Sequence, residues 1–485
     1  MISSINKKFL LILSIFFLFT LFFRIFLIST GIIRLDFLSL IFFQLILFLC
    51  LSSIYLYYLE NKKKYQAPIV PLVSVFFFFS YGTSLEFIST TINLYNHNIL
   101  IKTLLIILLG VFFFNFAYFI SKNFFKVRSV EGNQLFNLED IDNKKMFIFM
   151  LIIYLIYFIN YFFDFPNIPR KFLIPTLFFL FIYSTINFFK SKKFLTKLTI
   201  FILNINILVV EYSSSSFALP MQLLISILIT YVLLKKKIPY SFVLIFFIIL
   251  LIFHGLKADY RSLTYQTENN NEKTENLSEN SYKRYYQFLN FYKIKIRELA
   301  IDKKNYISNI INITFHNNSS RVSHSFSSLL IIVNKTPEKI DYLYGSSYKP
   351  LLTKFIPRFI FYNKPKEDYG NFFGHRYEIL YPTDFSTSWN MPVINESYAN
   401  FGIFGVILVM SLLGLFVRLL VSKFSVSNYN NLEFIVGIAI TTQLFFLESN
   451  LSLIIGNILI SIILLYIIFF TISFFNKKFL NVRKN

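Results

Sequence analysis

The stretch that decides the organisation of the chain is Phe355–Gly405, FIPRFIFYNKPKEDYGNFFGHRYEILYPTDFSTSWNMPVINESYANFGIFG. It ends the only long polar segment and runs into an apolar stretch with the length of a membrane helix. It holds an arginine after a proline, a lysine before a proline, a His–Arg pair, the only tryptophan and a glutamate at the edge of the apolar stretch. The rest of the chain is expected to carry this segment to one side of a membrane.

Apolar runs dominate the rest of the sequence. Of the 485 residues, 55% are hydrophobic and 20% are aromatic, and the mean hydropathy is +0.60. Repeated runs long enough to cross about 30 Å of hydrocarbon are typical of a polytopic membrane protein. We therefore predict an all-α polytopic membrane protein with about 12 transmembrane helices, at residues 9–30, 35–59, 68–90, 99–120, 146–165, 172–189, 195–211, 216–234, 239–256, 396–421, 432–448 and 452–475.

The net charge of +22 suggests a nucleic-acid partner at first, but the positions of the basic residues argue against one and indicate an orientation in the membrane. Lysines and arginines concentrate in alternate connections between the predicted spans, where basic residues stay on the cytoplasmic side. We expect a multi-pass protein of the cytoplasmic (inner) membrane with both termini in the cytoplasm. The polar segment between helices 9 and 10 is then a large periplasmic or extracellular loop.

This topology divides the chain into three parts. Residues 1–256 form an N-terminal membrane domain, 257–395 the large loop, and 396–485 a C-terminal membrane domain of three helices. Within the loop, Lys283–Ala300 has the pattern of a basic amphipathic helix. Such a helix can lie on lipid headgroups or cover a cavity of its own protein, and the sequence leaves both open. A further helix is expected around 319–333.

The chemistry of the loop points to phosphate binding. The chain has no Gly-rich phosphate loop, no HExxH, no G-x-S-x-G and no histidine spacing that predicts a metal site. Arg358 stands out because Pro357 and Pro365 restrict the backbone around it and around Lys364. Guanidinium groups bind phosphate oxygens bidentately, which suits a polyprenyl-diphosphate headgroup. The other candidate phosphate ligands are Lys257, Arg261, Arg321, Lys364 and Arg376.

A series of short motifs runs through this region. Gly345 and Tyr348 are followed by Pro357–Arg358 and Lys364–Pro365. The series Glu-x-Tyr-x-Asn-Phe-Gly, residues 396–402, then opens the next apolar stretch. These motifs resemble the Wzy-type oligosaccharide repeat-unit polymerases, the O-antigen and capsular polysaccharide polymerases, and the resemblance implies a GT-C-like architecture. One departure is Phe361–Tyr362 before Asn363, where the family usually has a tryptophan.

The resemblance implies a glycosyltransferase that acts on undecaprenyl-diphosphate-linked oligosaccharide. A growing glycan would move from its polyprenyl diphosphate to the next repeat unit, with no nucleotide cofactor and no required metal. Arg358 would neutralise the leaving diphosphate, helped by Arg261 and Arg376. Glu396 and His375 are the candidate bases, and Trp389 and Tyr398 could stack on sugars. Membrane lipid, a chain-length regulator and a flippase of the same pathway are the other expected partners.

Two alternatives stay open at this stage. One is another polyprenyl-phosphate-dependent glycosyltransferase or an O-antigen ligase, for which Asp36 would be the acid of the first outer loop. The other is a lipid-linked oligosaccharide flippase, which would be a transporter and no enzyme. The long outer loop favours chemistry at the membrane surface.

Overall fold

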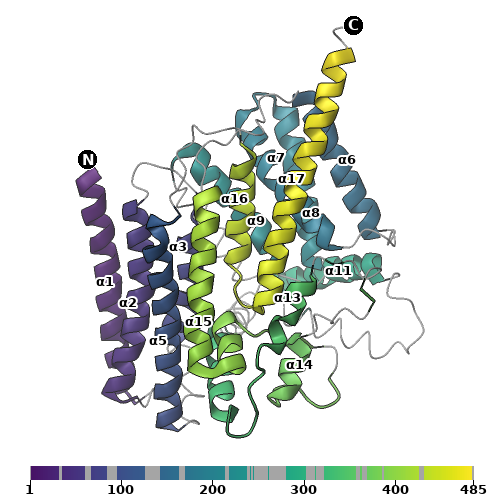
Figure 1. Ribbon diagram of the computed structural model, residues 1–485. Helices are drawn as coiled ribbons and strands as arrows, with labels where there is room; N and C mark the ends of the chain where they lie inside the picture. Colours follow the sequence, from purple (N-terminus) through teal and green to yellow (C-terminus); the bar gives the residue numbers. More distant parts are fainter. Residues whose placement is uncertain are drawn as a thin grey trace. The chain divides into compact units, whose positions relative to one another are not determined.

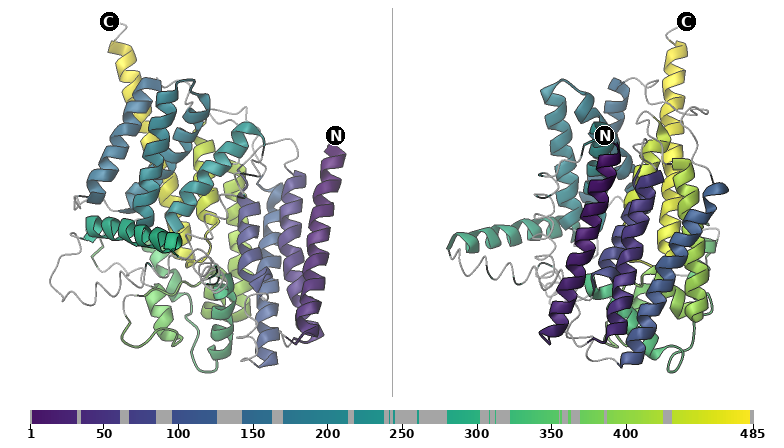
Figure 2. Two further views of the ribbon diagram at one scale, coloured as in Figure 1. Left: turned by 180° about the vertical axis from the view of Figure 1, so that it is seen from behind. Right: turned by 90° about the vertical axis from the view of Figure 1, so that its left-hand side faces the viewer.

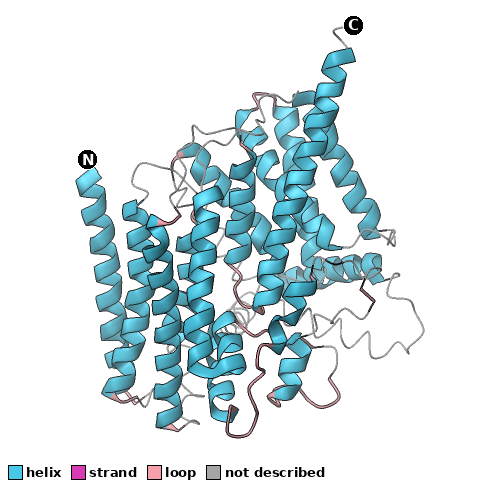
Figure 3. Cartoon of the chain, in the orientation of Figure 1, coloured by secondary structure: helices cyan, strands magenta, loops and turns pink. Residues whose placement is uncertain are grey.

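The computed structural model describes residues 2–31, 35–60, 67–84, 96–125, 143–162, 170–213, 218–237, 241, 244, 260, 280–301, 308, 312, 322–354, 356, 361–362, 369–384, 387–424 and 431–482. In this part of the chain the regular structure is helical, and no strand is present (Figure 3). The chain forms two compact units. Unit 1 comprises Met1–Ser129, Ser319–Ser425 and Gln443–Ile460, and unit 2 comprises Val130–Asn318, Val426–Thr442 and Ser461–Asn485.

Unit 1 contains long helices that stand side by side, α1 beside α2, α2 beside α5, and α5 beside α15 (Figure 1). Short helices complete the unit, and one further helix covers residues 322–335. The bounds are α1 Ile2–Ser29, α2 Phe37–Glu60, α3 Ile69–Phe77, the π-helix η1 Phe78–Gly82, α5 His97–Ile120, η3 Ser121–Asn123, η6 Ser346–Tyr348, α13 Lys349–Thr353, α14 Tyr369–Arg376 and α15 Val393–Phe424.

Helices α5 and α15 approach closely because glycines face the contact. A Cβ on Gly414 would lie 2.4 Å from the carbonyl oxygen of Phe114, and one on Gly110 would lie 3.2 Å from the side chain of Ile394. Small residues let helix backbones meet inside a membrane, where packing replaces the hydrophobic effect as the driving force. Arg418 of α15 also donates to the carbonyl of Phe125 just after α5. Helix α15 is thus held against α5 both near its beginning, at Ile394, and in its later half, at Gly414 and Arg418.

Unit 2 contains α6 Asn143–Phe162, α7 Arg170–Lys190, α8 Phe194–Ser213, α9 Ala218–Lys235 and α11 Asn280–Ile301. Polar contacts link α6 to α8: Tyr154 donates to Asn204 and Tyr157 donates to the buried Glu211. Helices α16, Leu432–Leu444, and α17, Leu451–Val482, contribute residues to both units.

Most of the predicted spans coincide with helices where the structure describes the chain, but the span 432–448 is helical only to Leu444 and the described part of the span 68–90 contains α3 and η1, which end at Gly82. Seven of the described helices are long and apolar enough to cross a membrane, and four shorter apolar helices lie at 14–29, 69–82, 147–162 and 432–444. The predicted span 239–256 lies almost entirely outside the described residues, so a total of twelve stays a prediction. The division into 1–256, 257–395 and 396–485 and the GT-C-like architecture also stay predictions. The helices expected at 283–300 and 319–333 are confirmed as α11 and as 322–335.

Candidate functional site

The site is organised around a break in helix α15. Phe401 has φ −143° and ψ 18°, and Gly402 has φ 64° and ψ −149°, so the helix stops at Asn400 and restarts directly afterwards. A glycine adopts this positive φ without strain. The break frees backbone carbonyls, which inside a membrane need new partners. The amide of Leu343 donates to the carbonyl of Ala399 at 3.0 Å, and that of Tyr344 to the carbonyl of Asn400 at 3.2 Å.

The first half of α15 carries a buried carboxylate that accepts hydrogen bonds on both oxygens. Glu396 is 0% exposed. Its Oε1 accepts from the hydroxyl of Ser347 at 2.6 Å, and its Oε2 accepts from the amide of Leu451 at 2.6 Å, at the start of α17. Asn400 donates to the Ser347 hydroxyl at 2.8 Å and accepts from the amide of Gly345 at 2.9 Å. We call these five residues the Glu396 cluster.

Two tyrosines next to the Glu396 cluster titrate above their ordinary range. Burial, and secondarily the carboxylate of Glu396, raise the pKa of the Tyr348 and Tyr369 phenols. Tyr369 at the start of α14 donates to the carbonyl of Ser346 at 2.7 Å. Since its phenol stays protonated at physiological pH, this hydrogen bond holds α14 to the loop that carries Ser347.

Asn395, the neighbour of Glu396, holds α15 to two further elements of unit 1. Its amide nitrogen donates to the carbonyl of Ser325 at 2.9 Å and to the hydroxyl of Ser328 at 2.8 Å. Its oxygen accepts from the hydroxyl of Tyr81 in η1 at 2.9 Å. All three partners come from segments far away in the sequence. The side chain of Asn395 therefore joins η1, helix 322–335 and α15 at one buried point.

Tyr398 is buried, and its ring does not lie open to a sugar. Its hydroxyl donates to the carbonyl of Thr336 at 3.3 Å, and Lys102 lies over its ring at 5.8 Å. The Thr336 hydroxyl lies 3.0 Å from that of Tyr377 directly after α14. Tyr398 thus connects the first half of α15 to α14.

The remaining described candidates lie on α14 and on the segment that follows it in the chain. His375 Nε2 lies 2.8 Å from the carbonyl oxygen of Asp384, and Arg376 donates to the carbonyl of Asp341 at 2.7 Å. Trp389 packs against the ring of His324, with 4.4 Å between centroids. His375, Arg376 and Trp389 are each partly exposed, so part of each side chain remains accessible.

Unit 1 thus holds Glu396, His375, Arg376, Trp389 and Tyr398. Tyr369 of α14 bonds to Ser346, the neighbour of the Glu396 partner Ser347, and Tyr377 directly after α14 contacts Thr336, which accepts from Tyr398. The candidate phosphate ligands Lys257, Arg261, Arg321, Arg358 and Lys364 lie outside the described residues. Sequence reasoning missed the anchoring partners Asn395 and Ser347. Polar residues in an apolar helix were a usable signal for Asn395, since such residues are costly in a membrane unless they are paired.

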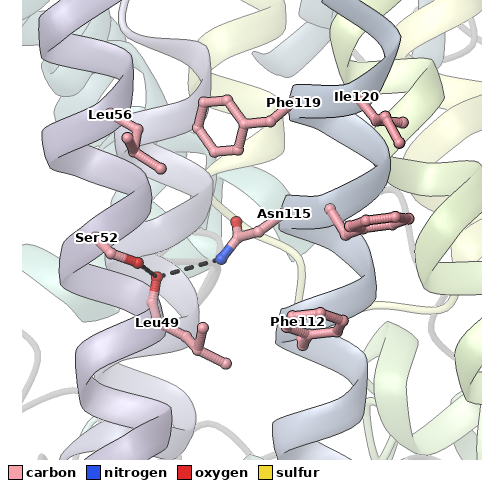
Figure 4. A pocket seen from close by; sticks show the side chains of 8 residues that line it. Leu49, Ser52, Leu56, Phe112, Asn115, Phe119 and Ile120 are labelled. Carbon is pink, nitrogen blue, oxygen red and sulfur yellow. Dashed lines mark hydrogen bonds between the residues drawn. The ribbon is translucent and has the colours of Figure 1, made fainter.

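A separate groove lies between α2 and α5, with a volume of about 330 Å³ (Figure 4). Its walls are mainly Leu and Phe side chains, including Leu56, Phe112 and Phe119. Its two polar side chains, Ser52 and Asn115, both donate to the carbonyl of Leu49. The groove therefore offers hydrocarbon surface and no group that could act in catalysis.

Residues 321–478 match the family model described as O-antigen polysaccharide polymerase Wzy. No curated protein and no solved structure matches the chain. The matched range contains the whole Glu396 cluster, and the apolar helices of the described residues fit a multi-pass membrane protein. The resemblance to the Wzy-type polymerases is thereby confirmed by a match over residues 321–478.

Proposed function

We propose that the protein polymerises lipid-linked oligosaccharide repeat units on the outer face of the cytoplasmic membrane. A growing glycan would be transferred from polyprenyl diphosphate to the next lipid-linked repeat unit. The observation that carries the proposal is the family match, because it covers the segment in which α14, the Glu396 cluster and α15 are joined. No observation favours the ligase or the flippase over the polymerase.

The proposed reaction exchanges one carbon–oxygen bond for another. A hydroxyl at the non-reducing end of the new repeat unit attacks the anomeric carbon of the growing glycan. The bond from that carbon to the diphosphate oxygen breaks, and the carrier leaves with its diphosphate. The hydroxyl proton passes to a base, for which we propose His375, since its imidazole is partly exposed and is oriented by the carbonyl of Asp384.

Basic residues would stabilise the charge that develops on the leaving diphosphate. Arg358 would have the main role, helped by Arg261 and Arg376, and Lys257, Arg321 and Lys364 would be further ligands. Preorganised cations act most strongly where water is excluded. Trp389, which is partly exposed, would pack on a sugar ring.

The geometry suits Glu396 to a positioning role. A base must reach the acceptor hydroxyl, whereas Glu396 is fully buried and both its oxygens already accept hydrogen bonds. Its carboxylate holds the loop at Ser347 to the start of α17, and this loop leads through α13 toward Arg358. Glu396 would therefore fix the segment that presents the proposed diphosphate ligand.

The proposal is tested by deleting the gene in its host and complementing the deletion. A polymerase deletion leaves single repeat units on the surface carrier, a flippase deletion leaves none, and a normal chain-length distribution contradicts the polymerase. Complementation with Arg358→Ala should give no polymer at an unchanged protein level. Polymer of normal length with this variant would exclude the role proposed for Arg358.

A further inference from the structure

Helix α11 lies against the ends of two other helices of unit 2, α6 and α8. Tyr285 packs on Phe162, the last residue of α6, with ring centroids 6.0 Å apart. Tyr292 reaches Tyr212 near the end of α8, with 3.1 Å between the hydroxyl oxygens. A helix of 20 residues is about 30 Å long, the thickness of the hydrocarbon core. Its end therefore marks the boundary between hydrocarbon and headgroups.

One face of α11 is covered by other residues of unit 2. Phe288 and Phe291 are each 6% exposed and form an aromatic cluster with Tyr212 and Tyr260. Tyr292 packs against this cluster. The helix thus packs on its own protein, which is one of the two uses that the sequence left open. This contact occupies only one side of the helix.

The opposite side of α11 is exposed and mixes apolar with basic residues. Tyr286, Leu289, Lys293 and Arg297 follow one another at helical spacing, and we call them the outer stripe. Tyr286 is 58% exposed and Leu289 is 45% exposed, and Lys293 and Arg297 are also exposed. Glu298 pairs instead with Lys295, at 3.1 Å, outside the outer stripe.

The direction of α11 determines which environment surrounds the outer stripe. The helix runs roughly across α6–α9, and one of its ends reaches out sideways beyond them (Figure 2, right). A helix that projects sideways from membrane-spanning helices at the level of their ends extends over the surrounding lipid headgroups. A stripe of tyrosine, leucine and two cations matches that environment, because the aromatic and aliphatic groups enter the boundary and the cations meet phosphates.

We propose that the outer stripe of α11 binds the headgroups of anionic bilayer phospholipids and holds this end of unit 2 at the membrane surface. Each basic side chain near an anionic membrane surface contributes about fivefold to binding. Lys293 and Arg297 together are then worth about 30-fold. This interaction does not depend on the reaction proposed above.

The test uses the full chain in nanodiscs and a nitroxide label on α11. Cys50, the only cysteine, is buried and is replaced by alanine, so that Tyr286→Cys carries the only label. In nanodiscs with phosphatidylglycerol, collisions with lipid-soluble oxygen should exceed those with a water-soluble nickel chelate. A label at Tyr381→Cys, a position 82% exposed in unit 1, reports the accessibility of an aqueous site.

Charge reversal supplies the second arm. Lys293→Glu with Arg297→Glu should lower the equilibrium constant between the lipid-bound and water-exposed positions of α11 at least about 30-fold. Nanodiscs of phosphatidylcholine alone should shift this equilibrium in the same direction. Lys339→Glu with Lys349→Glu, two exposed lysines of unit 1, should leave the label at 286 unchanged.

Two results would overturn the proposal. One is a label at 286 that is as accessible to the nickel chelate as the label at 381 in anionic nanodiscs. The other is a response of the 286 label to added polyprenyl-diphosphate oligosaccharide with none to phosphatidylglycerol, which would assign the outer stripe to the substrate. Because all four side chains are exposed, the variants should keep the wild-type gel-filtration profile.

Discussion

Replacing Glu396 by glutamine distinguishes an anchoring carboxylate from a general base. The substitution keeps the size and shape of the side chain. The glutamine oxygen can accept from the amide of Leu451, and its NH2 group can donate to the Ser347 hydroxyl, which has a second lone pair beside the one used by Asn400. The two hydrogen bonds persist in altered form, but the charge is lost.

The structure sets the size of the effect. Exchanging charge-assisted for neutral hydrogen bonds should cost about 1–2 kcal/mol in stability. Glu396→Ala is more severe, since it leaves two buried donors without an acceptor, at about 1–3 kcal/mol each. We therefore expect about 2–6 kcal/mol for alanine, enough to remove most folded protein, and a folded and active glutamine variant.

The assay combines the apparent unfolding temperature of the full chain in nanodiscs with polymer length in a complemented deletion strain. Glu338→Gln, at an exposed acid of unit 1, is the matched control and should behave as wild type. General base catalysis contributes about 10²–10⁴-fold. A Glu396→Gln protein that folds as well as wild type but loses polymerisation by about 100-fold or more would refute the anchoring role and make Glu396 the base.

Three further predictions concern the surroundings of Glu396. Asn395→Ala removes three hydrogen bonds of a buried amide and should lower stability by about 2–4 kcal/mol, seen as a lower apparent unfolding temperature. Gly402→Ala places a Cβ 2.8 Å from the Tyr342 hydroxyl at a φ of +64° and should cost about 1–3 kcal/mol; adding Tyr342→Phe should restore only part, since the backbone strain remains. The hydrogen bond from Lys335 lowers the pKa of Glu378 below 4.5. The stability it contributes is therefore complete above about pH 4.5 and is lost on acidification through the lowered pKa, so the difference in unfolding temperature between wild type and Glu378→Gln should vanish in acid.

The membrane helices could be predicted because their signal is local. A run of about 20 apolar residues indicates a span without knowledge of its neighbours. Within the described residues, the predicted runs coincide with helices such as α2, α5 and α17. The two helices in the polar segment were also predictable, one from its amphipathic spacing.

The site was less predictable because its contacts are distant in the sequence. Ser347 and Leu451 lie 49 and 55 residues from Glu396, and no local pattern pairs them with it. The break at Phe401–Gly402 depends on the amides of Leu343 and Tyr344. An apolar stretch that continues to Phe424 indicates one unbroken helix, so the break was not predicted.

The structure also changes what the motif Glu-x-Tyr-x-Asn-Phe-Gly means in this chain. Glu396 holds the start of α17, Tyr398 holds Thr336, and Asn400 holds the loop at Gly345 and Ser347. Phe401 and Gly402 then interrupt the helix so that this loop can pair with its freed carbonyls. Each of these contacts joins segments that lie far apart in the sequence. In the reaction proposed here the motif builds the support, and the chemistry falls to the residues that this support presents. Glu396→Gln and Arg358→Ala should therefore differ: the first should keep polymer, and the second should abolish it at an unchanged protein level.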